Sequence, residues 1–352
     1  MTGYDYGNAR LRARRAALLR AEHYADLAGR DLPALAAALA ATCYRAQAAA
    51  PAGTAGGHLG QLSRMARDHL VAALCGLGGL YRGRASGVAA ALLGPFDVHA
   101  VLTVLRARHH QIPAEAACAQ LLPVGGVTAQ IALQAAREPD LPAAARFLAA
   151  RRLPDPDTAA ALGPAQRRYE IDADLARVEQ TVARSARARQ AATLAAAGPE
   201  AAPAAAAVRR ETDDLNLLLA LRLRAAAPGG SGEAGAFLPG GSVALPRLDA
   251  IRRAASAGDA VTAAAAAHAA WHGPLKAWAQ DSDLATLHAG LETGRLRTQL
   301  RELRTADPLG AAVAAHYVLA HQAQARNLRL LGQAAARAIS HEEAGRQLVT
   351  PI

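Results

Sequence analysis

The chain has 352 residues, of which 52% are hydrophobic but only 3% aromatic, and its formal net charge is +10. Alanine dominates the apolar fraction, and because it favours helices and fills little volume, this composition indicates closely packed helices and excludes a thick aromatic core. No stretch alternates apolar and polar residues as strands do, and three widely spaced cysteines suit a reducing compartment better than a disulfide framework or zinc site, so we expect an all-α protein.

The first predicted element is a long arginine-rich helix over residues 4–29. Asp31 is expected to cap the next helix, because proline at position 33 suits a first helical turn. A Gly/Pro/Ala-rich loop over 50–60 follows. Further helices are predicted over 62–80 and 86–93, the second ending at Gly94-Pro95.

The next predicted helix covers residues 98–108 and begins at Asp97 as its N-cap. Apolar residues recur along it at helical spacing and predict one buried stripe, formed by Val98, Val101, Leu102 and Leu105. Arg106 and Arg108 fall in the last turn, where positive charge interacts favourably with the helix dipole. Residues 191–207 and 228–235 are of low complexity and are expected to form loops or helix ends.

Two internal repeats organise the chain. An offset of 116 residues superposes Asp97 on Asp213, Gly125 on Gly241, and the pair Arg106 and Arg108 on Arg222 and Arg224. An offset of 109 residues superposes Asp31-Leu32-Pro33-Ala34 on Asp140-Leu141-Pro142-Ala143, and Asp174-Leu175-Ala176 on Asp283-Leu284-Ala285. Repeats of this kind indicate modules that bury their apolar faces against neighbouring modules.

The repeated blocks define three helical modules. One covers residues 97–212 and another covers 213–322, while the last is split between the ends of the chain, with 323–352 completing 1–96. Because the order of blocks wraps around the termini, we predict that the termini meet and that the three modules form a ring.

The sequence predicts no catalytic residues, no metal site and no cofactor. The only lysine, Lys276, lies in His-Gly-Pro-Leu-Lys-Ala, which lacks the glycine and hydroxyl residues of a phosphate-binding P-loop. Asp97 and Asp213 are interpreted as helix caps and not as catalytic carboxylates.

The positive charge is almost wholly arginine and predicts acidic partners such as nucleic acid, anionic headgroups or acidic protein surfaces. Few aromatic residues accompany the arginines to stack on bases, which argues against nucleic acid. The longest uncharged runs are too alanine-rich to span a bilayer, so the protein is expected to be soluble or peripheral to a membrane. The candidate partner-interface residues are Arg10, Arg12, Arg14, Arg15, Arg106, Arg108, Arg222 and Arg224.

Short segments in order along nearly the whole chain carry a family resemblance. They are Tyr6-Gly7-Asn8-Ala9-Arg10-Leu11-Arg12, Asp97-Val98-His99, Asp213-Asp214-Leu215-Asn216-Leu217, Phe237-Leu238-Pro239-Gly240-Gly241, Asp307-Pro308-Leu309-Gly310 and Asn327-Leu328-Arg329-Leu330-Leu331. The ordered set resembles the C-type rotor component of rotary V/A-type ATPases and ATP synthases, which is the counterpart of the d-type component of the eukaryotic vacuolar enzyme.

This resemblance implies a funnel of three pseudo-threefold-related helical modules that acts as a non-catalytic socket in the rotor. Such a socket joins the central stalk to the proteolipid ring, so that torque links ATP hydrolysis or synthesis to proton or sodium transport. The implied partners are those rotor subunits, with no nucleic acid and no small-molecule substrate, and the implied location is the cytoplasmic face of the plasma membrane, where the protein is peripheral. The direction of catalysis and the identity of the ion remain open.

Two other hypotheses stay open from the residues alone. One is a helical-repeat binding module for an acidic partner such as nucleic acid. The other is an α-helical isoprenoid synthase, which needs Asp-Asp-x-x-Asp to bind magnesium; the pair Asp213-Asp214 lacks the third aspartate.

Overall fold

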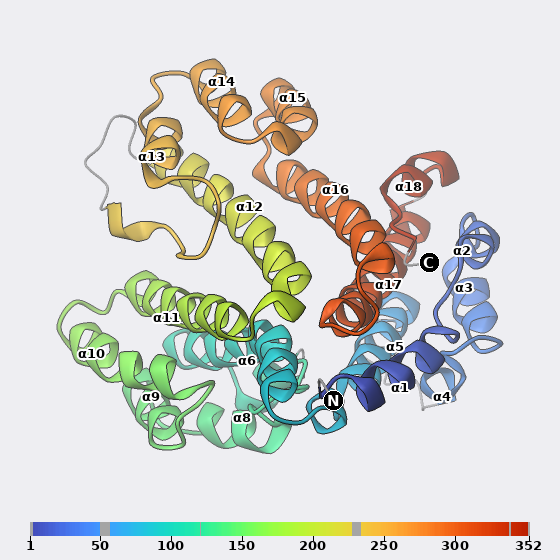
Figure 1. The fold of residues 1–352 in the computed structure, drawn as a ribbon, viewed down its shortest axis with the longest axis horizontal. Coiled ribbons are helices and arrows are strands. Elements are labelled where there is room, and N and C mark those ends of the chain that lie inside the picture. Colours follow the sequence, from blue (N-terminus) through green and yellow to red (C-terminus); the bar gives the residue numbers. More distant parts are fainter. Residues whose placement is uncertain (1–2, 50–56, 120, 227–233, 338, 351–352) are drawn as a thin grey trace. The chain divides into compact units, whose positions relative to one another are not determined.

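The computed structural model describes residues 3–49, 57–119, 121–226, 234–337 and 339–350. Within these residues the chain forms eighteen α-helices and four short 3-10 segments, and no strand occurs (Figure 1). The predicted all-α class is therefore confirmed. The chain divides into two compact units, unit 1 with Met1–Leu93 and Leu296–Ile352, and unit 2 with Gly94–Arg295.

Unit 1 is built around the long helix α17, Ala312–Arg337, which packs mainly against α5 and also contacts α1 and α3. Most residues of α17 are buried on every side, as expected of a central helix. The other elements of unit 1 are α1 (Asp5–Arg15), α2 (Ala21–Leu27), α3 (Leu32–Leu39), α4 (Arg45–Ala48), α5 (Gly57–Leu74), η1 (Leu77–Leu80), α18 (His341–Gln347), the start of α6 (Arg84–His109) and the end of α16 (Leu284–Thr305).

Unit 2 contains two hydrophobic clusters formed by successive helices. One cluster lies among α6 to α11, and the other among α12 to α16. The elements are α7 (Ala114–Cys118), α8 (Ala129–Ala136), α9 (Leu141–Ala150), α10 (Pro156–Asp172), α11 (Leu175–Ala196), η2 (Pro199–Ala201), α12 (Ala202–Ala226), η3 (Ala234–Ala236), α13 (Leu245–Arg253), α14 (Ala257–Ala267), η4 (Ala269–Trp271) and α15 (His272–Asp281).

Helix starts predicted from the 109-residue repeat are present. Asp31 Oδ1 accepts a hydrogen bond from the Ala34 amide at 2.8 Å, and Asp140 Oδ1 accepts one from the Ala143 amide at 2.7 Å. Asp174 accepts from the backbone amide of Arg177 at the start of α11. Each carboxylate satisfies an amide that has no partner inside its helix, so these aspartates set the helix starts.

Other predicted boundaries are wrong. Helix α6 runs without interruption through Gly94-Pro95, and α12 runs through residue 213, so neither Asp97 nor Asp213 begins a helix. The predicted helix over 4–29 is two helices, α1 and α2, and the helix predicted over 62–80 begins earlier and ends at Leu74. Most of 191–207 is helical, whereas positions 50–56 and 228–233 of the predicted loops lie outside the described residues.

Among the described helices, α6 alone is long and apolar enough to cross a membrane. In its most apolar stretch, 56% of α6 is buried inside the protein. Val101, Val104 and Leu105 are fully buried in the first cluster of unit 2. This burial accounts for the apolar composition of α6 as that of a core helix.

Candidate partner interface

Asp97 holds a loop that follows α7. Its carboxylate accepts hydrogen bonds from the amide of Gly126 at 2.9 Å and from the amide of Val127 at 2.8 Å. Gly125 lies so close that a Cβ there would stand 2.2 Å from Asp97 Oδ2. Burial raises the pKa of Asp97, and the two amides partly counter that effect.

Asp213 of α12 likewise holds a loop, the one that contains Ser242 and Val243. Its carboxylate accepts from the amides of Ser242 at 2.8 Å and Val243 at 3.0 Å, and from the Ser242 hydroxyl at 2.5 Å. A Cβ on Gly241 would stand 2.4 Å from Asp213 Oδ1. Both aspartates are therefore occupied in fastening loops, which explains their repeat better than a cap or a catalytic role.

A second fastening uses asparagine. The Asn216 side chain donates to the Leu238 carbonyl at 2.9 Å and accepts from the Leu238 amide at 2.7 Å. Asn327 of α17 makes the same pair of bonds with Val349, at 2.7 and 3.0 Å. The last described residues are thus held on the central helix of unit 1 by the same device that holds a loop on α12.

Helix α1 is fixed tightly inside unit 1 by Asn8, which is almost fully buried. The Asn8 amide nitrogen donates to the carbonyls of Pro308 and Gly310, each at 3.0 Å, and its oxygen accepts from the Tyr81 hydroxyl at 2.9 Å. Gly7 allows the close approach, because a Cβ there would lie 2.3 Å from the Tyr81 ring. These contacts seat α1 against the segment between α16 and α17.

The four predicted arginines of α1 lie on two flanks of this seated helix. Arg10 places its guanidinium 5.8 Å from the centre of the Tyr6 ring. Arg14 lies near Tyr317 of α17, where its charge partly counters the burial that raises the pKa of that tyrosine. Arg12 is exposed and Arg15 half-buried on the other flank. Burial and the nearby charges of Arg12 and Arg304 lower the pKa of Arg15, so the structure brings these three arginines together.

The predicted arginines of unit 2 have different surroundings. Arg106 forms a two-point ion pair with Glu179 of α11, with distances of 2.5 and 3.1 Å. Arg108 donates to the carbonyls of Ile112 and Glu138 beyond the end of α6. Arg222 is exposed and Arg224 half-buried near the end of α12. Arg106 and Arg108 are thus engaged within the unit.

Sequence reasoning missed a buried polar network on α12. Asp214 Oδ1 accepts from the Trp271 indole at 2.9 Å, and Oδ2 lies 3.2 Å from Nε of Arg295. Glu211 pairs with Arg187 at 2.9 Å. Burial raises the pKa of Asp214 to about 6 although Trp271 and Arg295 favour its charged form. The available signal was the presence of three carboxylates on one largely apolar helix, since buried charges need partners.

The ordered segments that carry the resemblance fall on these fastening points, since Asn8, Asp97, Asp213, Asn216 and Asn327 all belong to them. Comparison with known families gives a match to the family described as ATP synthase (C/AC39) subunit over residues 7–347. The chain belongs to this family. No curated protein matches the chain.

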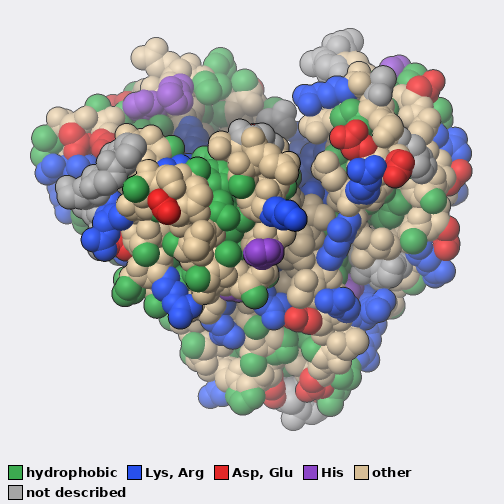
Figure 2. All heavy atoms as spheres, turned by 90° about the horizontal axis from the view of Figure 1, so that it is seen from above, with side chains coloured by type: hydrophobic (Ala, Val, Ile, Leu, Met, Phe, Trp, Pro, Cys, Tyr) green, Lys and Arg blue, Asp and Glu red, His purple; other side chains and the backbone are tan. Residues whose placement is uncertain are grey.

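The charge of this C/AC39-family chain is unevenly divided between the units. Unit 1 holds 18 arginines and 9 acidic residues, whereas unit 2 holds 21 basic and 20 acidic residues, so their formal charges are +9 and +1. Basic side chains are spread over much of the surface visible in Figure 2. The excess positive charge of the chain therefore belongs to the unit that contains α1.

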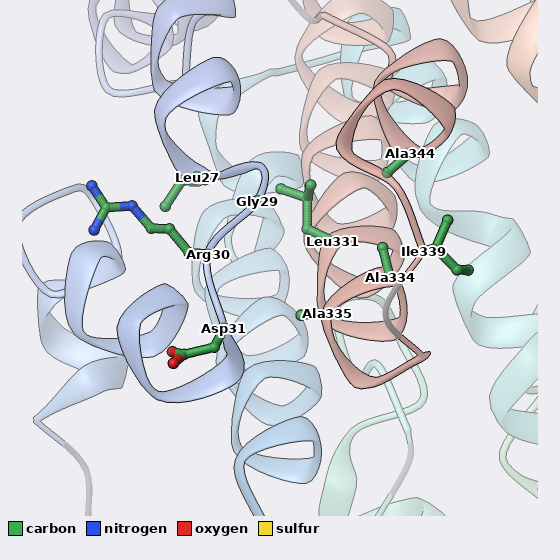
Figure 3. A pocket seen from close by; sticks show the side chains of 9 residues that line it. All are labelled: Leu27, Gly29, Arg30, Asp31, Leu331, Ala334, Ala335, Ile339 and Ala344. Carbon is green, nitrogen blue, oxygen red and sulfur yellow. The ribbon is translucent and has the colours of Figure 1, made fainter.

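A pocket of about 260 Å³ lies in unit 1 beside the last turns of α17 (Figure 3). Its walls are mainly apolar, formed by Leu27, Leu331, Ala334, Ala335, Ile339 and Ala344. The two charged residues at its rim have other contacts, since Arg30 pairs with Asp26 and Asp31 caps α3. The pocket thus brings no uncommitted charged group to a ligand.

Proposed function

We propose that the chain is the non-catalytic socket of a V/A-type rotary ATPase, joining the central stalk to the proteolipid ring. The observation that carries the proposal is the family match over residues 7–347. The partners are then the stalk and ring subunits, and the location is the cytoplasmic face of the plasma membrane, where the chain is peripheral. In this function torque passes through the chain between nucleotide chemistry and ion movement.

The fastening contacts support this proposal on physical grounds. A part that transmits torque must resist deformation, and buried side chains that pin loops to long helices oppose local opening. Asp97, Asp213, Asn216 and Asn327 each make two or more such bonds to backbone groups. The carboxylates of Asp97 and Asp213 are engaged in holding loops, which supports the proposal that the chain is non-catalytic.

We further propose the three-module organisation, with modules 97–212, 213–322 and 323–352 joined to 1–96. Two matching pairs of contacts support it. Asp97 and Asp213 each accept from two successive backbone amides, and Asn216 and Asn327 each bind the carbonyl and the amide of one residue. Unit 1 contains both terminal segments, as a divided module requires.

Purification of the tagged full chain from its native membranes tests the function. Identification of the bound proteins by mass spectrometry is expected to give the catalytic, stalk and proteolipid subunits of one rotary ATPase. Complexes lacking the chain are expected to hydrolyse ATP without pumping ions. Recovery of the chain without any of these subunits, or a steeply salt-dependent shift of nucleic acid by the chain, would overturn the proposal.

A further inference from the structure

One flank of α1 carries converging positive charge in unit 1. Asn8, Arg12 and Arg15 are spaced by four and three residues and so lie along one stripe of the helix. Asn8 binds the carbonyls of Pro308 and Gly310, which turns this stripe toward the segment that follows α16. Arg304 from the last turn of α16 joins it there, as its effect on the pKa of Arg15 reflects.

These three arginines lack the internal partners that neutralise arginines elsewhere. Within the part of the chain that the structure describes, Arg12, Arg15 and Arg304 form no ion pair with an acidic residue. Other arginines are paired with acidic residues inside their own unit, such as Arg30 with Asp26 in unit 1 and Arg106 with Glu179 in unit 2. Grouping like charges without a counter-charge is unfavourable, so an anion supplied from outside the chain would stabilise the group.

We propose that Arg12, Arg15 and Arg304, with the neighbouring Leu309, form a docking surface for an acidic polypeptide segment of another protein of the same complex. This inference rests on the proposed function. Each guanidinium can hold a carboxylate through two parallel hydrogen bonds. Leu309 is 58% exposed between the two residues whose carbonyls Asn8 binds, and an exposed apolar side chain on the same segment suits a protein interface.

The geometry argues against a lipid surface as the occupant. A helix that lies on a membrane inserts its apolar face between the headgroups. The apolar face of α1 is already used inside unit 1, because Leu11 is fully buried and Gly7 packs on the Tyr81 ring. Binding of single-stranded nucleic acid requires aromatic side chains that stack on bases, and Tyr6, the exposed aromatic residue of α1, lies on the opposite flank.

The test compares Arg12→Gln/Arg304→Gln with Arg45→Gln/Arg329→Gln. Both pairs remove two exposed arginines from unit 1, so the change in net charge is matched. The first double variant is expected to lower the recovery of partner ATPase subunits with the full chain about tenfold, and the control to leave it unchanged. Because Arg15 is half-buried, it is left intact, and circular dichroism verifies that both variants are folded.

The source of the anion is tested with purified chain and two probes, poly-L-glutamate and vesicles of phosphatidylglycerol. The proposal expects Arg12→Gln/Arg304→Gln to weaken binding to poly-L-glutamate about tenfold relative to the control variant, with a smaller effect on vesicles. Equal recovery of ATPase subunits by both variants, or a loss confined to vesicle binding, would overturn it. If the unaltered chain recovers no other ATPase component, the proposed function is refuted instead. The comparison of the two variants on poly-L-glutamate then still decides whether these arginines bind an acidic polypeptide.

Discussion

Asp97 and Asp213 stand 116 residues apart and hold equivalent loops through matching pairs of backbone hydrogen bonds. Each carboxylate accepts hydrogen bonds from two successive amides, which lie 29 and 30 residues further along the chain. A glycine 28 residues after each aspartate leaves space for the carboxylate. The internal repeat of the sequence is therefore a repeat of tertiary contacts, and it extends beyond local helix signals.

Replacing Asp97 by alanine is expected to destabilise unit 2. The change leaves the amides of Gly126 and Val127 without their acceptor, and two lost hydrogen bonds of this kind cost about 2–4 kcal/mol. Urea unfolding followed by circular dichroism measures the loss. Asp155→Ala, which removes the N-cap of α10, is a control with an expected cost of about 1 kcal/mol. A smaller loss for Asp97→Ala than for the control would contradict the importance of the loop contacts.

Alanine at Gly125 is expected to be harmful and alanine at Gly126 to be tolerated. The added Cβ at position 125 would stand 2.2 Å from the Asp97 carboxylate, whereas at position 126 its closest neighbour is Leu153 at 3.4 Å. We expect Gly125→Ala to lower the free energy of unfolding by about 1–3 kcal/mol, as overpacking does, and Gly126→Ala by much less. Thermal melts of the two variants check the order, and equal melting temperatures would refute it.

The sequence was sufficient for the helical class and for several helix starts, because those depend on local patterns such as Asp31 and Asp140 before Leu-Pro. It misled at Asp97, which follows Gly94-Pro95 by two residues and so has the appearance of an N-cap, while its true partners lie in a distant loop. The repeated pairing of aspartate with glycine was the sequence signal for this contact. The approach of Arg304 to α1 could not be predicted, because the two segments are nearly 300 residues apart and only the fold joins them.

His69 is expected to make unit 1 sensitive to acid. Burial lowers its pKa to about 4, against 6.5 in the unfolded chain. Between these values the unfolded state binds a proton and the folded state does not, so stability is lost as the pH falls below about 6.5, by about 3 kcal/mol in total. The stability of the wild type minus that of His69→Leu, measured in urea, should therefore decrease from pH 7 to pH 4. A pH-independent difference would show that His69 is not the responsible group.

Asp214 is expected to give the opposite pH dependence in unit 2. Burial raises its pKa to about 6, above the unfolded value of 3.8, so the folded state holds the proton more tightly than the unfolded state between those values. The contribution of this group to stability is complete below about pH 4 and is lost as the pH rises through 6, by about 3 kcal/mol. Asp214→Asn keeps an oxygen for the Trp271 indole but cannot titrate. The stability of the wild type minus that of Asp214→Asn should thus fall between pH 4 and pH 6 and stay level above pH 7. A difference that instead rises with pH would mean that Arg295 dominates and holds the carboxylate charged.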